Sequence, residues 1–199
     1  MLRKLIATAV AVTAVGTSTL LMPAADAAPT TVQLGGVHEK APTLEALTEL
    51  VIQRILVGDD VAASKYFSGK PVDDPVREQQ IVDSVRASAV QLGIDPDSTE
   101  AFFRAQIEAS KVVQRGLLAY WAAHPDKAPT SGPDLNVIRE KLDALTTQLL
   151  GELVRVDGLR GSGLRCGISL AIADATGAAS HHLDPLHRRA LHTASTATC

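Results

Sequence analysis

The pattern of apolar and polar positions predicts helices along most of the chain. The first helix follows Pro42, with Thr43 as its expected cap. Its apolar residues recur three or four positions apart, as on one buried helical face: Leu44, Leu47, Val51, Ile55 and Leu56. Gly58 is expected to weaken or bend this helix, and helical character then continues to Phe67.

Further segments have the same helical character, and none alternates with the period of a strand. A helix begins at Pro75, capped by Asp73 or Asp74, and runs to about Leu92. The others are a long helix over about 97–123, one capped by Asp134 over 135–156, and two short ones over 165–176 and 184–197. Aromatic residues are only 3% of the chain, so the core must be aliphatic. These features predict an all-α, single-domain bundle of about six helices with one long central helix.

The first 27 residues have the pattern of a signal peptide. Arg3 and Lys4 precede an uncharged apolar run over 5–22, and small residues then favour cleavage after Ala27. An uncleaved membrane anchor is the alternative, because the run is just long enough to span a bilayer. We therefore expect a signal peptide over 1–27, a flexible leader over 28–42, a helical domain over 43–199, and a secreted or periplasmic protein.

Charge and cysteine content narrow the partners. The chain has 19 Lys+Arg and 22 Asp+Glu, and removal of residues 1–27 would leave a formal charge of −4. Without basic blocks, this charge argues against nucleic acid or, after cleavage, a membrane as partner. In an exported chain, Cys166 and Cys199 are expected to form a disulfide, worth about 3–4 kcal/mol. The histidines near the C-terminus are poorly spaced for a shared metal ion, so no metal is expected.

Polar residues next to apolar stripes are the candidate functional residues. Arg54 and Lys65 are 11 positions apart, about 20° on a helical wheel, so both would project in one direction if the helix continues through Gly58. Ser110 and Gln114 form an i, i+4 pair on the long helix, and Arg139 is one turn into its own helix. Each alone is more simply a surface residue. If they converge, they form a cationic pocket.

The stretch KYFSGKPVDDPVREQQ places Lys65 and Arg77 on either side of a Pro/Asp turn, with Asp74 and Glu78 nearby. Together with Arg54, Ser110/Gln114, Arg139 and the C-terminal tail with its two cysteines, this order and spacing resemble the all-helical, AroQ-class chorismate mutases. The exported gamma subclass is the more similar one. The resemblance covers about residues 43–199, and it explains the turn as a device that brings two cations toward one anionic ligand.

The resemblance implies that the chain rearranges chorismate to prephenate, without a cofactor and as a homodimer with the long helix at its interface. It implies catalytic roles for Lys65, Gln114 and Arg77, the first two as donors to the ether oxygen. It implies that further residues bind the substrate: Arg54, Arg139, Ser110, the backbone at Asp74, and either Glu78 or Gln80 at the ring hydroxyl. Lys111 stands where relatives can have an acidic residue, and the sequence gives it no role.

Two other hypotheses are compatible with the residues themselves. A non-catalytic exported protein that binds a small dicarboxylate would need the arginines, but not Lys65 and Gln114 together. A purely structural helical domain would not bring these side chains together at all. The positions of the side chains therefore discriminate between the hypotheses.

Overall fold

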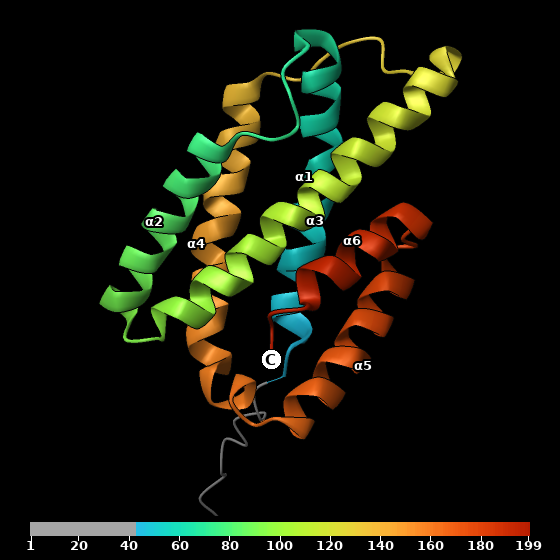
Figure 1. Cartoon of the computed structure of the whole chain (residues 1–199). Coiled ribbons are helices and arrows are strands. Elements are labelled where there is room, and N and C mark those ends of the chain that lie inside the picture. Colours follow the sequence, from blue (N-terminus) through green and yellow to red (C-terminus); the bar gives the residue numbers. More distant parts are fainter. Residues whose placement is uncertain (1–42) are drawn as a thin grey trace, which may run out of the picture. The chain divides into compact units, whose positions relative to one another are not determined.

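The computed structural model describes residues 43–199 and confirms the all-α prediction (Figure 1). Its six α helices are α1 (Glu45–Ser68), α2 (Pro75–Leu92), α3 (Pro96–Ala123), α4 (Leu135–Arg160), α5 (Leu164–Ser180) and α6 (Pro185–Ser195), with a short 3-10 turn at Pro125–Lys127. None of these helices is long and apolar enough to cross a membrane. The predicted signal peptide and leader, residues 1–27 and 28–42, lie outside the described residues.

Most of the helices begin at an aspartate. Asp74, Asp95, Asp134 and Asp184 each accept a hydrogen bond from a backbone N–H in the first turn that follows. A proline opens α2, α3 and α6, where its missing N–H costs no helical bond. The prediction for α1 was wrong, because Leu44 occupies the cap position and no side chain caps this helix.

Helix α1 runs without a break through Gly58, contrary to the expected weakening there. Gly58 is buried against α3, and a Cβ atom at this position would lie 3.2 Å from the side chain of Val113. The glycine therefore allows two helices to approach closely rather than ending one of them. Helix α4 is also longer than predicted and ends at Arg160.

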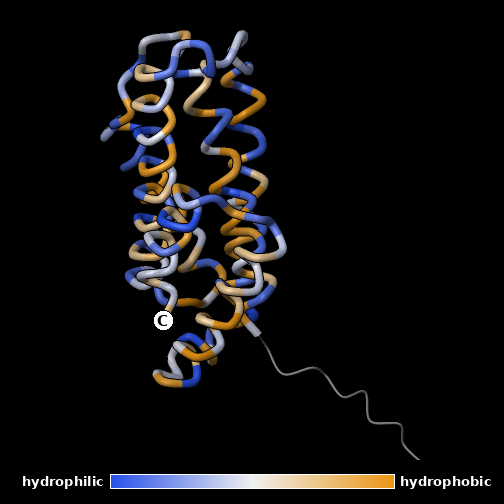
Figure 2. The backbone as a smooth tube through the Cα atoms, turned by 90° about the vertical axis from the view of Figure 1, so that its right-hand side faces the viewer, coloured by the Kyte–Doolittle hydropathy of each residue, from blue (hydrophilic) through white to orange (hydrophobic). Residues whose placement is uncertain are grey.

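Helix α1 is central to the core, because it packs against α3, α4, α5 and α6. Hydrophobic and hydrophilic residues are interleaved along all the helices, as an amphipathic bundle requires (Figure 2). The interior is mainly Leu, Ile, Val and Ala, and its largest fully buried side chains are Phe102 and Phe103 of α3. The core is therefore mainly aliphatic as expected, with these two aromatic side chains as exceptions.

The C-terminus is fixed to the bundle at several points. The predicted disulfide joins Cys166 and Cys199. The guanidinium of Arg160 donates to the carbonyl oxygens of Thr198 at 2.8 Å and Ala197 at 3.3 Å. Gln106 donates to the carbonyl of Ala194 at 3.0 Å. The last residues are therefore held by covalent and polar contacts as well as by packing.

A buried histidine connects α6 to α1. The Nε2 atom of His187 is 2.9 Å from Asp59 Oδ1, and its Nδ1 is 2.9 Å from Asp184 Oδ1. Both ring nitrogens face carboxylates, which only the imidazolium can satisfy by donating twice. The hydrogen bond to Asp59, with that to Asp184, raises the pKa of His187 to about 9. No cluster of His, Cys, Asp or Glu within residues 43–199 is placed to hold a metal ion.

His187→Gln should remove a pH-dependent part of the stability. A histidine whose pKa is raised on folding stabilises most below its unfolded pKa of about 6.5, and this contribution is lost as pH rises through 9. We expect the variant to be on the order of 2 kcal/mol less stable at pH 6 and to approach the wild type at pH 10. Urea unfolding at both pH values measures this, with His124→Gln as the exposed control. A difference that does not change with pH would contradict the assignment.

Candidate active site

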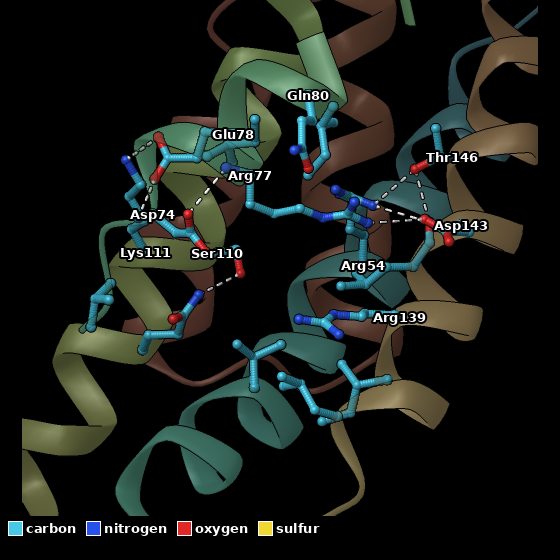
Figure 3. Close-up of a pocket in the computed structure, with 18 of the residues that line it drawn as sticks. Arg54, Asp74, Arg77, Glu78, Gln80, Ser110, Lys111, Arg139, Asp143 and Thr146 are labelled. Atoms are coloured by element: carbon cyan, nitrogen blue, oxygen red, sulfur yellow. Dashed lines mark hydrogen bonds and ion pairs between the residues drawn. The ribbon is translucent and has the colours of Figure 1, made fainter. Parts of the chain in front are cut away.

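One cavity of about 800 Å³ lies between α1, α2, α3, α4 and the 69–74 connection (Figure 3). All nine residues singled out from the sequence line it: Arg54, Lys65, Asp74, Arg77, Glu78, Gln80, Ser110, Gln114 and Arg139. They come from four helices and a loop. The side chains therefore converge, which a purely structural domain would not require.

Arg54 is the most deeply buried cation of the site, with 5% of its surface exposed. Its Nη1 donates to the carbonyl of Leu142 and to the hydroxyl of Thr146, both at 3.3 Å, while its Nε has no partner. Within the described residues no carboxylate forms an ion pair with it. Burial therefore lowers the pKa of Arg54 to about 10. A buried guanidinium with an unused donor is prepared to bind an anion.

Lys65 lies at the end of α1, about three turns from Arg54 on the same side of the helix. Its Nζ donates to the carbonyl of Val72 in the 69–74 connection at 2.8 Å. This bond uses one of three N–H donors, and the other two remain available. Partial burial lowers the pKa of Lys65. The continuity of α1 through Gly58 is what places both cations at the same cavity.

Ser110 and Gln114 face the cavity from α3. The Gln114 amide Nε2 donates to Ser110 Oγ at 2.9 Å, whereas Gln114 Oε1 is buried and has no partner. Since Oγ accepts this bond, the Ser110 hydroxyl hydrogen remains available to a ligand. The second hydrogen of the amide is available in the same way. The pair thus presents two donors to the cavity.

The start of α2 is fixed by a reciprocal cap. Asp74 Oδ1 accepts from the backbone N–H of Arg77 at 3.1 Å, and Glu78 Oε1 accepts from the backbone N–H of Asp74 at 3.0 Å. The other oxygen of Glu78 is 2.7 Å from Lys111 Nζ. Both oxygens of Glu78 are therefore already engaged. Each oxygen can still accept a second hydrogen bond. Gln80, one turn beyond Arg77, is a further acceptor at the cavity.

Two arginines lie at the more open side of the cavity. Arg77 Nη2 is 3.9 Å from Asp143 Oδ1, with 43% and 71% of the two side chains exposed. A pair this long and exposed is weak. Arg139 of α4 is exposed and points toward the same space (Figure 3). Both guanidinium groups can therefore move to a ligand at little energetic cost.

Three further residues shape this site: Asp143 and Thr146, which the sequence did not indicate, and Lys111, to which it gave no role. Asp143 and Thr146 follow Arg139 by four and seven positions, so they share its helical face, which could have identified them. Lys111 is four positions after Ile107 and three before Gln114, and thus also on the cavity face of α3. Its nearly buried ammonium contacts Asp73, Glu78 and Glu108.

Arg54→Met should leave the protein as stable as the wild type or more stable by about 1–2 kcal/mol, because an unneutralised buried charge is replaced by an apolar chain. Arg160→Met is the matched control. Arg160 is also a buried arginine, but its donors are used by the carbonyls of Thr198, Ala197 and Ser98. Its loss should cost about 2–3 kcal/mol. Urea unfolding compares the two, and a larger loss for Arg54→Met than for Arg160→Met would contradict this interpretation.

Comparison with known proteins agrees with this arrangement. A family model described as chorismate mutase type II matches residues 45–115. The secreted chorismate mutase of Mycolicibacterium smegmatis is 36% identical over 161 residues, which cover 81% of this chain and 88% of that protein. That of Mycobacterium tuberculosis is 31% identical over 187 residues, covering 94% and 92%. The crystal structure of chorismate mutase from Burkholderia phymatum has a TM-score of 0.74 and 34% identity, covering 78% of this chain and 95% of that one. With its helices, its cavity and these relatives in agreement, the chain belongs to the type II chorismate mutase family.

Proposed function

We propose that the protein converts chorismate to prephenate in this cavity. The observation that carries the proposal is the pair of donors, Lys65 and Gln114, that lines the same cavity as three arginines. Arginines alone would suit any small dicarboxylate. The Lys65 ammonium and the Gln114 amide could in addition donate hydrogen bonds to an oxygen that belongs to neither carboxylate. This combination favours the catalytic hypothesis over simple dicarboxylate binding.

Binding would restrict the conformation of a flexible dianion. Arg54 is held on the cavity floor by Leu142 and Thr146, whereas Arg77 and Arg139 are exposed enough to move to the second carboxylate. Guanidinium groups match carboxylates with two parallel hydrogen bonds, so they fix orientation as well as position. With Ser110 donating to a carboxylate, the two reacting carbons would be held close together.

The chemical step breaks a C–O bond while a C–C bond forms within the same molecule, so no nucleophile or cofactor is needed. Negative charge develops on the ether oxygen as the C–O bond breaks. Lys65 and the Gln114 amide would both donate to this oxygen, and the bonds would strengthen as its charge grows. The pocket already holds both donors by hydrogen bonds to Val72 and Ser110. Little reorganisation would then be needed in the transition state.

The ring hydroxyl of chorismate would be bound at the start of α2. Glu78, one of two expected acceptors, has both oxygens engaged by the Asp74 amide and Lys111. We assign this role to Gln80, because its side chain lines the cavity and makes no hydrogen bond to another described residue. Glu78 can accept one further bond on each oxygen and is the second candidate.

We also propose export and a homodimer. Three relatives, those of Mycolicibacterium smegmatis, Mycobacterium tuberculosis and Yersinia pestis, are named secreted chorismate mutases. The Cys166–Cys199 disulfide suits an oxidising compartment. The homodimer rests on the resemblance, and an interface on α3 would be polar, since Arg104 and Glu108 are exposed on that helix.

The wild type should consume chorismate and yield prephenate as its only product, and Lys65→Ala should lower kcat roughly 10²–10³-fold through loss of one donor to the ether oxygen. Ultraviolet absorbance follows the substrate, and chromatography identifies the product. Lys127→Ala, which removes an exposed lysine outside the cavity, should react like the wild type. Binding of chorismate without turnover by the wild type would support the dicarboxylate-binding alternative instead.

Gln114→Glu should introduce a pH dependence that the wild type lacks. An amide donates at any pH, so we expect wild-type kcat/KM to be nearly constant from about pH 5 to 8. A carboxyl group at this position donates only when protonated, so the variant should be more active at pH 5 and lose activity as pH rises. Equal variant rates at pH 5 and pH 8 would refute the donor role of residue 114.

A further inference from the structure

Lys111 lines the cavity but takes no part in the catalysis proposed above. Its side chain is only 10% exposed, and its Nζ lies 2.7 Å from Glu78 Oε2, 2.9 Å from Glu108 Oε1 and 3.3 Å from Asp73 Oδ1. Although burial opposes the charge, hydrogen bonds to Glu78 and Glu108 raise the pKa of Lys111 above its usual value. The ammonium is therefore a permanent cation between three carboxylates, beside the cavity wall (Figure 3).

Lys111 affects the balance of positive and negative side chains around the cavity. The lining has six cationic side chains, Arg54, Lys65, Lys70, Arg77, Lys111 and Arg139, and four carboxylates, Asp73, Asp74, Glu78 and Asp143. This leaves two net positive charges for a ligand with two negative ones. Without Lys111 only one would remain, and Glu78 would face the ligand without a counter-ion. Repulsion between like charges in a partly buried site would then oppose binding.

Lys111 also holds the part of the chain that carries other site residues. Glu78 connects it to the backbone N–H of Asp74, in the cap that begins α2 and places Arg77. Asp73, which Arg115 also binds at 2.7 Å, is next to Val72, whose carbonyl orients Lys65. The charged groups that face the Lys111–Glu78 pair are thus Lys65 from α1, Asp73 and Asp74 from the connection, and Glu108 and Arg115 from α3.

We propose that Lys111 is a positioning residue for the dianionic substrate: it neutralises Glu78 and Asp73 at the cavity wall and fixes the start of α2 against α3. The proposal rests on the proposed function and adds a residue to that site. Lys111 does not touch the reacting atoms. It acts on substrate affinity through the carboxylates it holds, so its loss should change KM much more than kcat.

The test compares Lys111→Met, Glu78→Gln and the double variant in steady-state kinetics with chorismate. For Lys111→Met we expect kcat/KM to fall roughly 10- to 100-fold, mostly through a higher KM, because uncompensated carboxylates face the substrate. Glutamine at residue 78 keeps the oxygen that caps Asp74 but has no charge. The KM of the double variant should therefore fall most of the way back to the wild-type value. Lys127→Met, the same change at an exposed lysine outside the cavity, is the matched control.

Two results would overturn the proposal. The first is that the kinetics of Lys111→Met equal those of the wild type. The second is a fall in kcat/KM that the added Glu78→Gln does not restore, while thermal unfolding shows Lys111→Met and the double variant to be destabilised equally. Should Lys111→Met not fold, Lys111→Gln and Lys111→Arg decide. The arginine keeps the positive charge and should keep KM within about threefold of the wild type, whereas the glutamine loses it and should raise KM roughly 10-fold or more; equal KM values in these two variants would contradict the proposal. Should the wild type bind chorismate without converting it, the proposed reaction fails separately, and calorimetric titration of the same variants with chorismate tests Lys111. If the wild type neither converts nor binds chorismate, both proposals fail.

Discussion

Gathering positive charge around one partly buried cavity is the constraint on which the rest of this structure depends. Arg54 is buried without a carboxylate partner, which costs free energy that the surrounding fold has to offset. Its contacts with Leu142 and Thr146 orient the guanidinium but do not neutralise it. An anion bound beside Arg54 would offset this cost, because it would pair with the buried charge.

A second group of contacts, made by residues that do not line the cavity, holds the C-terminal part of the bundle. There the C-terminus is held by the Cys166–Cys199 disulfide, by Arg160 and by Gln106, and α6 is joined to α1 through His187. Helix α1 belongs to both parts, since it carries Arg54 and Lys65 and also packs against α5 and α6. The contact of His187 with Asp59 thus reaches α1 between Arg54 and Lys65.

The sequence predicted what depends on local patterns. Aspartate located the starts of α2 and α4, and proline that of α2, because caps act over three or four residues. The 11-residue spacing of Arg54 and Lys65 correctly indicated one direction, but only the unbroken α1 made it relevant. The prediction for Gly58 was wrong because a glycine is required there by the close approach of Val113 on α3, and not by the conformation of α1 itself. The ion pair between Lys111 and Glu78 could not be inferred from the sequence, because the two residues are 33 positions apart and no local pattern specifies which charges meet after folding.

The balance of charges at the cavity also bears on which ligands it can accept. Six cations against four carboxylates leave two positive charges, so a dianion would balance the charge of the site and a monoanion would leave one positive charge in excess. The carboxylates are as important here as the cations, because their number determines the net positive charge of the cavity. They are themselves held in place by Lys111, Arg115 and the cap of α2. Selectivity for two negative charges would thus arise from the whole wall. Replacing any one charged residue changes this balance, even where that residue does not touch the ligand.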